Sequence, residues 1–129
     1  MPNPEMANQW RSCAKTDYDV AVHDTTFCPI PIEIICYHSQ QAAEKALKSV
    51  LVYHDEEVPR IHDLYRILEL CLKHEPDLRK LSTQAKRLTK YAVLTRYPNE
   101  IDIEETDMRL ALEDAEIIVN TISSLWQNQ

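Results

Sequence analysis

Apolar side chains recur along this chain at three- and four-residue intervals, the spacing that gathers them on one face of an α-helix. Five stretches show the pattern, and short proline-containing or polar breaks separate them. The predicted helices cover about residues 6–23, 31–54, 62–73, 78–95 and 104–126. A length of 129 residues suits one ordinary domain, so we expect a single all-α domain over residues 1–129.

The chain contains no glycine, and this absence narrows the function classes. Glycine-rich phosphate loops, dinucleotide-binding fingerprints and Asn-Gly hairpins all need backbone conformations that glycine supplies. No apolar run approaches the roughly 20 residues that span a bilayer, so no membrane association is expected. The first residues show neither a basic region nor an apolar region typical of a secretion signal, and the expected location is cytoplasmic.

The charge is negative overall but unevenly distributed. A formal net charge of -7 argues against general nucleic-acid binding. Residues 79–96 nevertheless hold six basic side chains and no acidic one, whereas residues 99–117 hold eight acids and one arginine. The basic face of the fourth predicted helix is interpreted either as a solvated surface near the acidic fifth helix or as a surface for RNA phosphates.

Two groups of residues are only weak candidates for a metal or redox site. The four cysteines match no zinc or redox spacing, and we expect them to be small buried side chains. The His-Asp dipeptides suggest a metal phosphohydrolase drawn from His38, His62, Asp63 and Asp102, but polar residues that start the third helix explain His62 and Asp63 better. No metal and no cofactor is therefore predicted.

The second predicted helix carries a polar row. His38, Gln41, Lys45 and Lys48 follow a spacing that aligns them over about 15 Å of helix. One interpretation is an exposed face supported by Gln41–Lys45 and Glu44–Lys48 pairs; the other is contact with phosphates.

Arg96 is the basic side chain of the fourth predicted helix that projects back toward the apolar stripe. Pro98 disfavours helical backbone at Tyr97, so the helix should end near Arg96 and present its guanidinium at a terminus. The guanidinium would hold a phosphate there, or it would pair with a carboxylate such as Glu44 in a purely structural role.

Three ordered blocks resemble the HEPN family, the higher eukaryotes and prokaryotes nucleotide-binding domain. They are YHSQQAAEKALK at residues 37–48, HDL at residues 62–64 and LTKYAVLTRYP at residues 88–98. The opening and closing helices also fit, so the resemblance covers nearly the whole chain. It implies an up-and-down bundle of about five helices, a homodimer, and a gene beside a minimal nucleotidyltransferase in a toxin-antitoxin-like module.

Many HEPN relatives are metal-independent ribonucleases that use an arginine followed four to six residues later by a histidine. This sequence departs from that pattern, because Ile101, Asp102 and Ile103 occupy the positions after Arg96 where the histidine would stand. His38 could replace it only if the fold brings the two side chains together. The resemblance therefore implies nucleotide or phosphate binding more directly than catalysis.

Three hypotheses follow. The first is a non-catalytic dimeric partner of a minimal nucleotidyltransferase that binds a nucleotide, another phosphorylated group or RNA. The second is a metal-independent ribonuclease toxin with a displaced catalytic histidine, and the third is a structural subunit without a ligand. For the first, the residues expected to bind are His38, Gln41, Lys45, Arg96 and Tyr97.

Overall fold

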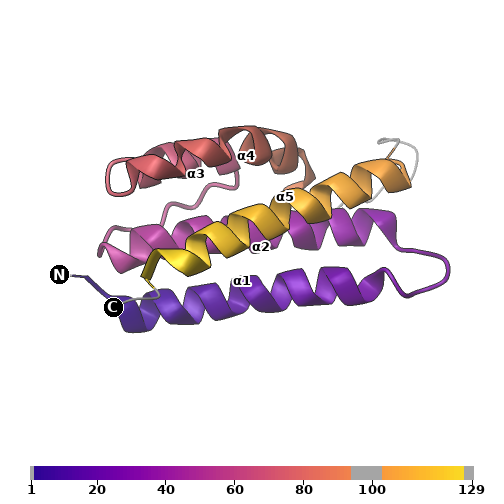
Figure 1. The fold of residues 1–129 in the computed structure, drawn as a ribbon, viewed down its shortest axis with the longest axis horizontal. Helices are drawn as coiled ribbons and strands as arrows, with labels where there is room; N and C mark the ends of the chain where they lie inside the picture. The colour runs from indigo at the N-terminus through magenta and orange to yellow at the C-terminus, as the bar shows by residue number, and fades with distance from the viewer. Residues whose placement is uncertain (1, 94–102, 127–129) are drawn as a thin grey trace.

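The computed structural model describes residues 2–93 and 103–126, and within these ranges the chain is built from helices without a β-strand (Figure 1). Two long helices lie side by side, a third long helix packs against both, and two short helices pack on the far side of the second (Figure 1). The all-α helical bundle is thereby confirmed. The α-helices are α1 (Pro4–Asp24), α2 (Ile32–Tyr53), α3 (Leu64–Cys71), α4 (Ser82–Leu88) and α5 (Glu105–Ser123).

Local sequence signals explain where the long helices begin. The Asn3 side chain accepts a hydrogen bond from the Met6 amide at 3.2 Å and so caps the start of α1. At the start of α5, Glu104 and Asp107 form a reciprocal capping box, in which the Glu104 amide donates to the Asp107 carboxylate at 2.9 Å. The acidic residues that crowd the start of α5 therefore stabilise its positive end.

The fourth predicted helix is not one continuous α-helix. The structure has a 3₁₀ segment, η1 (Pro76–Leu81), then α4, then a second 3₁₀ segment, η2 (Thr89–Tyr91). The buried residues Leu78, Leu81, Ala85 and Leu88 still form one stripe. Three-residue spacing fits a 3₁₀ turn as well as an α-helix, so the apolar pattern alone does not separate the two. The last predicted residues of this helix, 94 and 95, lie outside the described ranges.

Helix α2 forms the centre of the bundle, with α1, α3, α4 and α5 packed around it (Figure 1). One interpretation of the polar row gave this helix an exposed face, but neighbours on several sides bury most of its circumference. Glu44 and Lys48, which that interpretation paired on the exposed face, are buried. No helix within the described ranges combines the length and the apolar character that crossing a bilayer requires.

The turn after α2 shows how the chain manages without glycine. Asp55 adopts a left-handed backbone conformation with φ of 60°, a region that glycine usually occupies. Aspartate tolerates this conformation better than most residues because its short polar side chain can bond locally. The chain thus reverses direction after α2 at the cost of modest backbone strain.

Candidate functional site

Helix α2 keeps a half-exposed polar row along its mostly buried surface. His38, Gln41 and Lys45 lie on it, as the sequence predicted, and each is partly accessible. Lys45 does not pair with Gln41; its ammonium donates instead to the Asp17 carboxylate of α1 at 2.6 Å. Lys48, the fourth member of the predicted row, leaves it and turns into the protein, with its side chain 7% exposed. The accessible row is therefore three residues long.

A buried carboxylate lies beside this row. Glu44, whose side chain is 6% exposed, accepts hydrogen bonds from Lys48 Nζ at 2.9 Å and from Gln40 Nε2 at 3.2 Å. His62 Nδ1 lies 3.0 and 3.2 Å from its two oxygens. Burial alone would raise the pKa of Glu44, but the hydrogen bonds from these three partners outweigh it and hold the pKa below its ordinary value. Glu44 is thus an ionised group with fixed partners.

The same network ties the row to the loop before α3. Gln41 donates to the Gln40 side-chain oxygen at 3.0 Å, and Gln40 donates to the His62 carbonyl at 3.1 Å. Thr89 donates to the same carbonyl at 3.3 Å and accepts from the Leu64 amide at 3.0 Å. The backbone at His62 is consequently fixed from both α2 and η2.

The His62 imidazole has one nitrogen inside the network and one outside it. Its side chain is 62% exposed although Nδ1 contacts the buried Glu44 carboxylate. A neutral imidazole that donates a hydrogen bond from its Nδ1–H to a carboxylate presents an unprotonated Nε2 on the opposite edge of the ring. The pair can therefore accept a proton from a bound hydroxyl, or bind an anion when both ring nitrogens are protonated.

Arg96 and Tyr97, the other two predicted site residues, lie outside the described residues. The described chain before them passes Tyr91, which is buried and makes a side-chain hydrogen bond with Cys36 of α2. The alternative structural role for Arg96 was a pair with Glu44. That carboxylate already has three partners among the described residues.

The family follows from comparison with known domains. The model of the HEPN domain matches residues 7–125. The chain belongs to the HEPN family. One solved structure similar to this HEPN chain is TT1696 from Thermus thermophilus, with a TM-score of 0.74 and 24% identity over 91% of this chain and 95% of that one. Another is ST0689, an archaeal HEPN homologue, with a TM-score of 0.68 and 26% identity over 91% and 94% of the two chains. Among curated proteins no match was found.

The basic face of α4 in this HEPN domain is partly engaged within the molecule. Arg87 binds the buried Asp114 of α5 through two hydrogen bonds, at 2.7 and 3.1 Å. Lys86 lies over the Tyr65 ring at 4.5 Å from its centroid. The Arg87 contact joins α4 to the acidic helix α5, as the solvated-surface interpretation expected. Lys86 and Lys90 remain exposed.

The His62-Asp63 dipeptide has two separate roles in the HEPN fold. Asp63 caps α3, and its carboxylate accepts from the amides of Tyr65 at 3.0 Å and Arg66 at 3.4 Å. His62 turns to Glu44 instead. Among the residues the structure describes, no three His, Cys, Asp or Glu side chains gather in a way that would hold a metal ion. Asp102, which the metal interpretation requires, is not among them.

The expectation that all four cysteines are buried was wrong for two of them. Cys13 and Cys28 are exposed, whereas Cys36 and Cys71 are buried. Desolvation raises the pKa of both buried thiols to about 12. A buried thiol of this kind is a poor nucleophile at neutral pH, so Cys36 and Cys71 act as core side chains.

Sequence reasoning missed the pairing of His62 with Glu44. It considered His62 only as a metal ligand or a helix-initiating residue, and Glu44 only as a partner of Lys48 or Arg96. The Glu44–Lys48 pair was visible from its four-residue spacing. The partner 18 residues further along the chain had no such signal, because only the packing of α3 against α2 brings the two together.

Proposed function

We propose that this HEPN domain binds a nucleotide or another phosphorylated group along the half-exposed row of α2 and acts as a non-catalytic partner of a minimal nucleotidyltransferase. The observation that carries the proposal is the junction of that row with the His62–Glu44 pair. Gln41 is hydrogen-bonded through Gln40 to His62, so the accessible residues border a charged network that packing holds in place.

The chemistry of this surface suits phosphate. Gln41 and His38 offer hydrogen-bond donors, and Lys45 offers an ammonium whose present partner, Asp17, comes from a different helix. A phosphate oxygen competes directly with that carboxylate for the ammonium. The proposal gives Arg96 the role of phosphate clamp and Tyr97 that of its neighbour in the site, in line with the HEPN block in which both stand.

The proposal includes a homodimer and a toxin-antitoxin-like gene pair. Exposed apolar side chains support a protein interface, and Leu110 and Ile117 stand one above the other on α5, each 39% exposed. Sedimentation velocity should give twice the chain mass of 15.1 kDa. Co-expression with a minimal nucleotidyltransferase encoded beside the gene should yield a stable complex.

Calorimetric titration with ATP, GTP and their monophosphates tests the binding function. We expect a saturable signal at or below millimolar ligand, reduced most in Arg96→Ala and less in Lys45→Ala and His38→Ala. Lys73→Ala is the matched control, because Lys73 is an exposed lysine away from this row. The absence of any saturable signal at millimolar ligand would leave only the structural role for the domain.

A second candidate function, metal-independent RNA cleavage, is favoured by the geometry of His62. With its Nδ1–H donating a hydrogen bond to the Glu44 carboxylate, Nε2 would take the proton of a ribose 2′-hydroxyl as that oxygen attacks phosphorus. The 5′-oxygen would leave and receive a proton from solvent or from the imidazolium. His62, rather than the predicted His38, is thus the displaced histidine that such a nuclease would use.

Cleavage of mixed RNA in the presence of EDTA separates the two functions. A nuclease should produce fragments that vanish in His62→Ala and fall with Glu44→Gln, while His38→Ala remains active. Intact RNA with all proteins, together with retained nucleotide binding, supports the non-catalytic function.

A further inference from the structure

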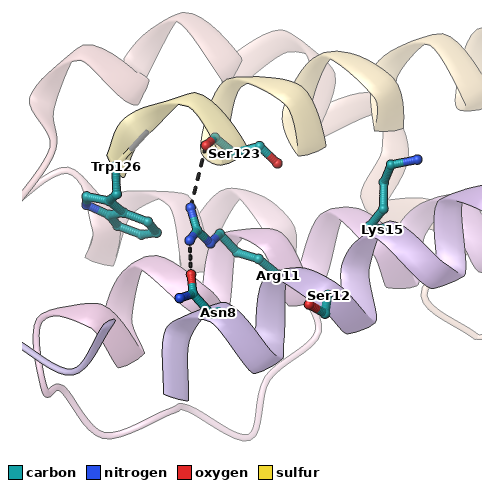
Figure 2. Close-up of a pocket in the computed structure, with 6 residues that line it drawn as sticks. All are labelled: Asn8, Arg11, Ser12, Lys15, Ser123 and Trp126. Carbon is teal, nitrogen blue, oxygen red and sulfur yellow. Dashed lines mark hydrogen bonds between the residues drawn. The ribbon is translucent and has the colours of Figure 1, made fainter. Parts of the chain in front are cut away.

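A second polar surface lies on the opposite side of α1 from the α2 row. The α1–α5 groove is an open hollow of about 360 Å³ between the first half of α1 and the end of α5 (Figure 2). Residues 11 and 15 lie one turn apart on one face of α1. Residues 10, 13 and 17 point about half a turn away from that face, and residue 17 is Asp17, the partner of Lys45. The groove and Lys45 therefore lie on different faces of α1. The groove is lined by Asn8, Arg11, Ser12, Lys15, Ser123 and Trp126.

Arg11 is the central cation of this groove, and its contacts are with neutral groups. Its guanidinium donates to the Asn8 side-chain oxygen and, at 3.5 Å, to the Ser123 carbonyl (Figure 2). It also lies over the Trp126 ring, 4.7 Å from the centroid. No carboxylate among the described residues forms a salt bridge with Arg11, although the chain is acidic overall.

The Arg11 guanidinium is also partly removed from water. Burial lowers the pKa of Arg11 from its ordinary value, so the groove withdraws water from a charge that no described carboxylate compensates. The guanidinium is also held in position, because Tyr53 stacks on Trp126 at 4.2 Å and leaves the other ring face for Arg11. A positioned and partly desolvated guanidinium is a strong binder of oxyanions.

Lys15 supplies a second cation one turn further along α1, and it projects toward α5 (Figure 2). Its partner Asp19 lies on the same helix at 2.6 Å, with both side chains more than half exposed. Solvent-exposed pairs of this kind are weak, so Lys15 can turn to an anion in the groove. The hydroxyls of Ser12 and Ser123 add neutral donors, and none of the described residues that line the groove is acidic.

We propose that the α1–α5 groove binds a phosphate group between Arg11 and Lys15. Free phosphate and the phosphate of a nucleotide share this chemistry. Since Tyr53 and Arg11 cover both faces of the Trp126 ring, a base finds no face for stacking there. The groove therefore recognises the phosphate and not the nucleoside, which separates it from the nucleotide site proposed on α2.

Trp126, one of the two tryptophans of the chain, lines the groove and reports on this site. Each tryptophan gives one indole N–H signal in a proton–nitrogen correlation spectrum, and Trp10→Phe assigns the signal of Trp126. We titrate with inorganic phosphate, AMP and adenosine at constant ionic strength set with sodium chloride. The Trp126 signal should shift saturably with phosphate and with AMP at similar millimolar affinity, and adenosine should leave it unchanged.

Variants make the assignment specific. Arg11→Gln should weaken phosphate binding at least about tenfold, since it removes charge-assisted hydrogen bonds. Lys15→Gln, an exposed change that leaves the fold intact, should weaken it about threefold. Arg109→Gln is the matched control, because Arg109 is an exposed arginine of α5 outside the groove. Lys45→Ala should leave the Trp126 shift unchanged, so the groove and the α2 site succeed or fail independently.

A saturable Trp126 shift with unchanged phosphate affinity in both Arg11→Gln and Lys15→Gln would overturn the proposal. So would an equal shift with adenosine, or no saturable shift with phosphate in the wild-type protein. If circular dichroism shows that Arg11→Gln does not fold, Lys15→Gln and Arg11→Lys carry the test. Both variants keep the helix; the first removes the ammonium of Lys15, and the second replaces the guanidinium of Arg11 with an ammonium.

Discussion

Removing the charge of Glu44 should destabilise the domain strongly. Glu44→Gln keeps the shape of the side chain but leaves the Lys48 ammonium, 7% exposed, without its counter-charge at 2.9 Å. Breaking a buried pair by removing one partner costs about 3–5 kcal/mol, against a total stability of about 5–15 kcal/mol for a typical domain. With an unfolding entropy of about 2.1 cal/mol/K per residue, this corresponds to a fall in Tm of about 11–18 °C.

Urea unfolding followed by circular dichroism at pH 7 measures the loss. Glu105→Gln is the control, because that carboxylate is 55% exposed and lies 3.7 Å from Arg109 on the same helix face. The control should cost no more than about 0.5 kcal/mol. The double variant Glu44→Gln/Lys48→Met should recover much of the stability, since it removes both charges. A loss below about 1 kcal/mol in Glu44→Gln would refute the assignment of a buried ion pair.

The stability that Glu44 contributes to the fold should fall at acidic pH. The folded-state pKa of Glu44 lies below its ordinary value of 4.5, so the ionised form stabilises the fold. This stabilisation is fully present above about pH 4.5 and is lost as the pH falls through the lower folded-state pKa. Glu44→Gln should therefore lose less stability than the wild type between neutral and acidic pH, and an unchanged acid profile would contradict the assignment.

Two further predictions follow from the fold. Asp63→Ala should reduce stability by about 0.5–2 kcal/mol in urea unfolding, because it removes the cap of α3; no change would show that the capping hydrogen bonds are dispensable. A disulfide reagent at neutral pH should modify Cys13 and Cys28 quickly and should reach Cys36 and Cys71 only in denaturant, and four equally fast thiols would contradict the burial of the latter two.

The apolar pattern predicted the helices well where a long amphipathic face decides the structure. The predicted spans 6–23 and 31–54 correspond to α1 and α2 within two residues at each end. Within residues 76–91 the pattern did not distinguish the 3₁₀ segments from an α-helix, because Leu78 and Leu81 occupy the same stripe in either structure. The choice between them depends on how the segment packs and on Pro76 at its start.

The arrangement of the candidate site was predicted in part, for a related reason. His38, Gln41 and Lys45 lie in a row because helical spacing alone determines that. Whether a polar side chain on α2 faces water depends on how many helices surround it, and this is why Glu44 and Lys48 are buried against expectation. His62 joins them through tertiary packing, which residue spacing does not encode.

The most direct test of the proposed role is a map of backbone amide shifts during titration with ATP. We predict that the largest shifts fall on the accessible row of α2, at His38, Gln41 and Lys45, and on His62. Phosphate alone should reproduce part of this map, and His62→Ala should reduce it. Shifts confined to other helices, or an unchanged spectrum at millimolar ATP, would contradict the placement of the binding site on α2.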